Sequence, residues 1–173
     1  MKISAIAILA LSLSASPQEP TLEATLTWMH DFTVARDPIF GHGNYIASTM
    51  TRDQWIFDSH GCSSSITDKL DSWDSAGKDH TVFHEILVSK FLLQGLDPES
   101  IEITDGFPAL PKVHGVFVST NNDTKSVDSF SNGKANIKTN RVEIDFTSRS
   151  DADRFAKAFR HAIVLCGGKP SVF

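Results

Sequence analysis

Histidine side chains are the first candidates for chemistry in this chain of 173 residues, which contains seven of them. His80 and His84 stand four residues apart, with Glu85 beside the second. On a helix this spacing directs both imidazoles to one side, as a zinc site requires, but the segment does not have the HExxH order. On a strand the two would share a face roughly 13 Å apart, too far for one ion. We therefore predict surface or half-buried histidines and no metal site.

A hydrolytic site is the alternative interpretation, and it would use a subset of four histidines: His60, His80, His84 and His114. Such an enzyme would be a metal-dependent or a serine hydrolase. The serine-rich segment GCSSSI, residues 61–66, lacks the final glycine of GxSxG. Because catalytic triads assemble in space and not in sequence, residue spacing leaves this alternative open. The sequence assigns no catalytic residue and no cofactor.

Charge and glycine patterns argue against phosphate-bearing partners. Lysine and arginine number 16 against 21 acidic residues, which gives a net charge of −5. Nucleic acids and anionic lipids favour clustered cations, so we predict that the chain binds no nucleic acid. The segments GHG and CGG lack the rest of a phosphate-binding loop. Trp28, Trp55 and Trp73 are interpreted as core and rim residues, with a sugar or peptide groove as the alternative.

The first sixteen residues predict an export signal. Lys2 supplies a positive charge, Ile3 to Leu13 form an apolar run too short to span a membrane, and Ser12 to Ser16 supply small residues for cleavage. We expect removal of this segment and a single domain over residues 17–173. The mature protein is then expected to be periplasmic or secreted and not bound to a membrane.

Cys62 and Cys166 are the only cysteines. In an oxidising compartment an even number of cysteines in a compact domain predicts a disulfide. Two separate buried thiols are the alternative interpretation. Cys62 lacks a CxxC spacing, so a redox-active thiol is not expected.

Helical patterns occur at both ends of the chain. Leu22, Leu26 and Met29 recur at helical spacing within residues 21–37, where Thr21 is a suitable N-cap and Pro38 predicts the end. The second pattern covers residues 150–166, with Ser150 as the expected cap, Asp153 as its capping-box partner and Gly167 as the terminating residue. Its predicted buried stripe consists of Phe155, Phe159, Ala162, Ile163 and Cys166.

Strand patterns fill the middle of the chain. The expected strands are 44–51, 54–62, 81–96, 100–104, 114–121 and 141–148, with a hairpin within 121–140. The apolar composition of 81–96 predicts a strand covered on both faces, with a helix as the rival. Turn residues predict a turn at 40–44, a polar loop at 63–80 and an exposed connection at 105–112. Val142, Ile144 and Phe146 are expected to point inward, with Glu143 and Asp145 outward.

Together these patterns predict an α+β fold. We expect a mainly antiparallel, bent sheet or partly open barrel of about six to seven strands. An N-terminal helix flanks this sheet, and a C-terminal amphipathic helix packs on it.

Several segments resemble a family of exported, functionally uncharacterised bacterial proteins, seen especially in acidobacteria. The resemblance rests on TLEATLTW, LLQGLDPESIEI and the C-terminal AKAFRHAIVLCGGKPSVF, close to the family ending AKAFxHAxxLCGGxxxPF. It implies a compartment and a shape but no activity. The order of a sheet before a terminal helix is also similar to pleckstrin-homology-like barrels, without the basic cluster of their lipid-binding members. Our preferred hypothesis is an exported, non-catalytic module that binds an unknown protein or small-molecule ligand.

Overall fold

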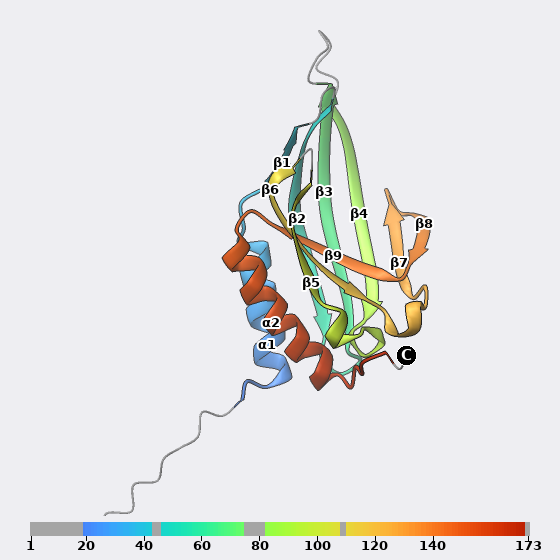
Figure 1. Cartoon of the computed structure of the whole chain (residues 1–173). Coiled ribbons are helices and arrows are strands. Elements are labelled where there is room, and N and C mark those ends of the chain that lie inside the picture. Colours follow the sequence, from blue (N-terminus) through green and yellow to red (C-terminus); the bar gives the residue numbers. More distant parts are fainter. Residues whose placement is uncertain (1–18, 43–45, 75–81, 108–109, 172–173) are drawn as a thin grey trace, which may run out of the picture.

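A computed structural model describes residues 19–42, 46–74, 82–107 and 110–171 of the chain (Figure 1). The predicted signal peptide lies outside these residues. The described helices and strands are α1 (Leu22–Val34), β1 (Ile39–His42), β2 (Ile46–Asp58), β3 (Ser63–Asp74), β4 (Val82–Leu92), β5 (Glu102–Phe107), β6 (Leu110–Ser119), β7 (Val127–Ser131), β8 (Lys134–Thr139), β9 (Arg141–Phe146) and α2 (Arg149–Leu165). Short 3-10 turns cover Leu93–Gly95, Pro98–Ser100 and Asn121–Asp123.

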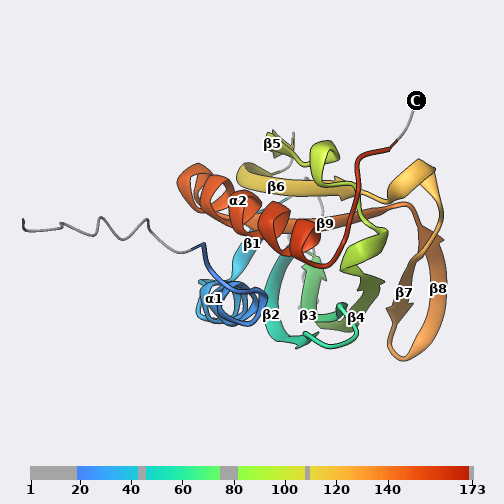
Figure 2. The same ribbon diagram turned by 90° about the horizontal axis from the view of Figure 1, so that it is seen from below.

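The strands form two antiparallel sheets. One has six strands in the order β1-β2-β3-β4-β7-β8, and the other has three in the order β5-β6-β9. The α+β class, the antiparallel pairing and the two terminal helices are as predicted, but the strands are divided between two sheets. Neither sheet closes into a barrel. Seen along the strands, the two sheets form layers, and α2 packs beside the three-stranded sheet (Figure 2).

Helix α1 begins as its sequence predicts. The Thr21 hydroxyl accepts a hydrogen bond from the Ala24 amide at 3.2 Å, and Leu26 and Met29 are buried. The helix ends at Val34, a turn earlier than Asp37. The turn predicted at 40–44 is wrong over its first half, because Ile39–His42 pairs with β2 as strand β1.

Strand β3 corrects the loop predicted at 63–80. Ser63–Asp74 is paired on both sides, with β2 and with β4, and Ser64 and Ile66 are buried. The polar composition misled the prediction because several polar side chains on this strand have partners inside the sheet, including Asp68. The two separate strands predicted at 44–51 and 54–62 are one strand, β2, with a register shift between Arg52 and Gln54.

Strand β4 is a strand and not a helix, as predicted. Its expected cover on both faces is wrong, because Phe83 is 67% exposed and Ile86 is 45% exposed. Figure 1 shows the reason: β2, β3 and β4 extend well beyond the helices. Only the end of β4 around Phe91 lies in the core.

The remaining strands form two hairpins and the edge strand β9. Residues 105–112 are not an open connection, because Phe107 pairs with Leu110 in the β5–β6 hairpin. The hairpin predicted within 121–140 is confirmed as β7–β8. Its turn, Asn132-Gly133, has positive φ at both positions, as a two-residue hairpin turn requires. In β9, Val142, Ile144 and Phe146 are buried as predicted.

Helix α2 fills the centre of the core. Phe155, Phe159, Ala162 and Ile163 are buried, and the Phe155 ring lies 5.4 Å from Trp55 and 5.1 Å from Phe146. The helix therefore contacts both sheets through one apolar stripe. Its cap is Ser148 and not Ser150, and the two hydroxyls lie 2.9 Å apart.

A disulfide fixes the end of α2, as predicted. Cys166 is bonded to Cys62 in the turn between β2 and β3, with their Cα atoms 5.8 Å apart. The amide of Leu93 donates to the Cys62 carbonyl at 2.8 Å, so the same turn is also held by the chain that leaves β4. Gly167 terminates the helix with a φ of 84°, a conformation that favours glycine.

Candidate functional site

The four candidate histidines of the hydrolase alternative do not share one described site. His60 is exposed beside the β2–β3 turn. His84 on β4 lies 2.7 Å from Asp71, and His114 on β6 lies 2.9 Å from Asp105. His80 lies outside the described residues.

Strand register gives the separation of two of these histidines. His60 precedes Ser63 at one end of β3, whereas His84 pairs with Asp71, eight residues further along that strand. Eight residues of strand span roughly 26 Å. Over the ranges that the structure describes, no three histidine, cysteine or acidic side chains are placed to hold one metal ion.

His114 belongs to a charged cluster that joins β5 and β6 to the start of α2. Arg149 donates to Asp105 at 2.6 Å, and His114 contacts the same carboxylate oxygen. The bond from Arg149, followed by that from His114, lowers the pKa of Asp105. The cluster lies at the surface of the protein, and its contacts link β5 and β6 to the start of α2. We therefore interpret its residues as structural.

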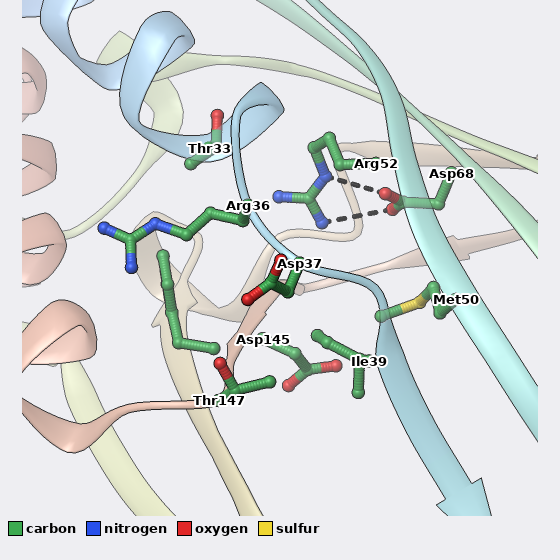
Figure 3. Close-up of a pocket in the computed structure, with 10 residues that line it drawn as sticks. Thr33, Arg36, Asp37, Ile39, Met50, Arg52, Asp68, Asp145 and Thr147 are labelled. Atoms are coloured by element: carbon green, nitrogen blue, oxygen red, sulfur yellow. Dashed lines mark hydrogen bonds and ion pairs between the residues drawn. The ribbon is translucent and has the colours of Figure 1, made fainter.

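A second polar cluster occupies a small pocket where α1, β1, β2, β3 and β9 meet (Figure 3). Arg52 donates two hydrogen bonds to Asp68, of 2.7 and 3.2 Å, and both side chains are largely buried. Figure 3 shows the Arg36 guanidinium directed away from this pair, and it bonds to Asp151 on α2. Asp145 lies across the pocket from Arg52 and Asp68.

Asp145 is the most perturbed carboxyl among the described residues. Its pKa is raised to about 7, chiefly by burial and also by the negative charges of Glu143 and Asp68, while Arg52 opposes the rise. One of its oxygens is buried with no hydrogen-bond partner among the described atoms. The sequence predicted an outward side chain here, which is wrong because this side of β9 faces the six-stranded sheet at the pocket.

The volume of this pocket limits its chemistry. It measures about 20 Å³, which is room for one or two water molecules. An organic substrate does not fit beside Asp145 without movement of the surrounding strands. A raised pKa in a cleft is a sign of catalysis only where a reactant reaches the group, so we interpret this cluster as structural.

Several concavities of ligand size lie in the described part of the chain, and the one with the most apolar surface is a groove between the two helices, which we call the α1–α2 groove. Its volume is about 500 Å³, within the range of roughly 300–1,000 Å³ typical of small-ligand sites. The lining residues are Pro20, Ala24, Thr25, Trp28, Arg154, Lys157, Ala158 and His161. Its exposed surface is mostly apolar, with the cationic groups contributed by α2.

Trp28 forms the aromatic wall of the α1–α2 groove. Its ring stacks on Phe32 at 4.3 Å, which fixes the indole on the helix. The guanidinium carbon of Arg154 lies 5.8 Å from the Trp28 ring and 5.1 Å from the Phe32 ring. From the sequence, Trp28 was interpreted as a core or rim residue, and a groove was only the alternative interpretation.

The cations of the groove have no acidic partner in the described part of the chain. Neither Arg154 nor Lys157 makes an ion pair or hydrogen bond there, and the guanidinium of Arg154 lies over the two aromatic rings. The ring of His161 lies 3.0 Å from the Pro20 carbonyl oxygen. These residues lie outside the buried stripe that the helical spacing predicts, and no sequence pattern brings them to Trp28. The one usable signal was that Arg154 and Lys157, three residues apart, face one side of α2.

Comparisons with known proteins identify no relative of this chain. A scan against models of protein families finds no match, and searches of curated proteins and of solved structures find no similar protein. The two resemblances stated from the sequence therefore stay predictions. In the described part of the chain, no helix combines the length and the apolar character needed to cross a membrane.

Proposed function

We propose that this chain is an exported, non-catalytic binding protein and that the α1–α2 groove is its ligand site. The observation that carries the proposal is the combination, in one groove of about 500 Å³, of the Trp28 ring with Arg154 and Lys157, which have no ion-pair partner among the described residues. Ligand sites are typically apolar concavities with a few polar groups that orient the ligand. The Arg52–Asp68–Asp145 pocket, at about 20 Å³, is a much poorer candidate.

Two features support export. The N-terminal residues carry the charge and apolar pattern of a signal peptide, and the Cys62–Cys166 bond is typical of proteins that mature in an oxidising compartment. Neither feature depends on the identity of the ligand. The placement of the protein in the periplasm or outside the cell is thus a proposal independent of the groove.

A dye titration tests the groove. We expect anilinonaphthalene sulfonate, an anionic aromatic fluorophore, to bind the folded protein saturably with one strong site per chain. The variant Ala24→Leu adds a side chain at the groove wall on α1, where Ala24 is exposed, and should remove this binding. Leucine is a good helix former, so α1 should stay intact.

The matched control is Ile56→Ala. Ile56 is 51% exposed and lines a different concavity, between α1 and β2, of about 460 Å³. Dye binding should be unchanged in this variant. Loss of binding in Ile56→Ala with retention in Ala24→Leu would place the ligand site elsewhere and reject the proposal.

A further inference from the structure

The cationic wall of the α1–α2 groove indicates the charge of its ligand. Arg154 and Lys157 both come from α2 and have no acidic partner among the described residues, in a protein whose net charge is −5. Two unpaired cations on an acidic protein repel cationic ligands and attract anions locally. We infer that the groove binds a small amphiphilic carboxylate, with its apolar body on Trp28 and its carboxylate toward Arg154 and Lys157. This inference rests on the proposed function.

The two flanks of Trp28 differ in charge, which orients the ligand. On the side away from α2, the indole borders a surface lined by Glu23 and Asp31. A carboxylate on that side would meet like charges, whereas on the α2 side it meets Arg154 and Lys157. The anionic end of the ligand is therefore assigned to α2 and the apolar end to the indole and alanine walls.

The groove geometry favours a small carboxylate over a phosphate or a long chain. Phosphate sites commonly use the free amides at a helix N-terminus. Here the cations lie inside α2, which starts at Arg149. From Arg154 to His161 the helix rises roughly 10 Å, so the wall fits a single ring or a short hydrocarbon chain. A planar guanidinium beside a lysine binds either anion, so the preference for a carboxylate rests on the absence of helix N-terminal amides from the groove wall.

Three unbranched ligands of about the same length but different head groups separate charge from apolar contact. Octanoate, octanol and octylammonium can be compared by isothermal titration against the purified protein at neutral pH. We expect octanoate to bind most tightly, octanol more weakly by about tenfold, and octylammonium not measurably. Added salt should weaken octanoate binding but not octanol binding, because only the former depends on charge.

Substitutions of the two cations test their role. Arg154→Gln and Lys157→Gln should each weaken octanoate binding by roughly two- to fivefold, as expected for exposed ion pairs, and the double variant should bind octanoate no better than octanol. Octanol affinity should change by less than octanoate affinity in each variant, because octanol carries no charge. Lys157→Arg should restore most of the octanoate affinity, which a purely structural effect would not predict.

The outcomes separate this inference from the proposed function. If octanoate and octanol bind equally, and Ala24→Leu removes both, the groove is a ligand site but the carboxylate assignment is wrong. If none of the three ligands and no dye binds, both proposals fail. Sedimentation of a dimer that Ala24→Leu dissociates would also overturn both, because a second copy of the chain would then fill the groove.

Discussion

At the scale of single residues, Asp145 is the described carboxyl group whose pKa is changed most by its surroundings. It lies in a pocket with Arg52 and Asp68, but Arg52 donates both of its described hydrogen bonds to Asp68. Asp145 thus has a buried carboxyl without an ion-pair partner among the described residues, and its pKa is raised to about 7. Below that pH the carboxyl is neutral, which is the form that a buried site favours.

The raised pKa of Asp145 predicts a stability that falls as pH rises. Between its ordinary pKa of 3.8 and about 7, the folded protein binds more protons at this carboxyl than the unfolded chain does. The free energy of unfolding should therefore decrease through this range, by roughly 2 to 4 kcal/mol from Asp145 alone. In Asp145→Asn the decrease should be correspondingly smaller, so that the variant is more stable than the wild type at pH 8. Urea unfolding at pH 5 and pH 8 measures both.

A neighbouring carboxylate provides the control for this prediction. Asp37 lines the same pocket but is exposed, so Asp37→Asn should leave the pH dependence of the unfolding free energy nearly unchanged. Equal pH dependence in the wild type and in Asp145→Asn would show that this carboxyl is ionised at an ordinary pKa and that the pocket is hydrated.

At the scale of elements, α2 organises the core. Its apolar stripe packs against β2 through Trp55, against β4 through Phe91 and against β9 through Phe146. Phe159 lies in the middle of this stripe, fully buried, with the Phe155 ring at 5.4 Å and the Phe91 ring at 6.3 Å. The helix therefore joins the two sheets through aromatic contacts.

Truncation of Phe159 tests this role. Phe159→Ala should lower the free energy of unfolding by roughly 3 to 5 kcal/mol, because it removes a buried ring and leaves a cavity between α2 and the six-stranded sheet. Val164, on the same helix, is 53% exposed, so Val164→Ala should change stability by only about 0.5 kcal/mol. Denaturant unfolding measures both variants. An unchanged midpoint for Phe159→Ala would contradict its place in the core.

The helices and strands differ in how well they could be predicted from the sequence. Both helices were predictable because an apolar stripe at helical spacing, together with Thr21 or Gly167 at an end, is a local signal. Strand β3 was not, because its polar residues read as a loop. They form a strand since β2 and β4 pair with both of its edges and Arg52 binds Asp68 across from β2. All of these contacts join β3 to residues on other strands, so no local pattern in the sequence reveals them.

At the scale of the whole molecule, one covalent bond joins the helix that fills the core to a hairpin of the large sheet. Cys62 and Cys166 are 104 residues apart in sequence, so the bond closes more than half of the 173-residue chain into a loop. A loop of this length restricts the unfolded chain by about 4 to 5 kcal/mol in the entropy model, and measured gains are frequently smaller.

Removal of the disulfide tests this contribution. The double variant Cys62→Ser, Cys166→Ser should unfold at lower denaturant, with a loss of about 2 to 5 kcal/mol. The wild type unfolded in the presence of a strong reductant is the matched control and should behave like the variant. Mass spectrometry of alkylated, unreduced protein should find neither thiol labelled. Labelling of both cysteines in protein isolated from its native source would show that the bond is absent there.

The fold and the candidate site differ in how much of each could be predicted from the sequence. The amino-acid sequence alone was enough to predict the two helices, most of the strands and the inward residues of β9, because each depends on local spacing. The cysteine count favoured a bond between Cys62 and Cys166 but left two free thiols as an alternative. The folded structure was needed to show that Trp28 meets Arg154 and Lys157, that Asp145 faces Arg52 and Asp68, and that the strands divide into two sheets. Such contacts depend on how α1, α2 and the sheets pack, and no local pattern encodes the distance between residues that lie far apart in the chain.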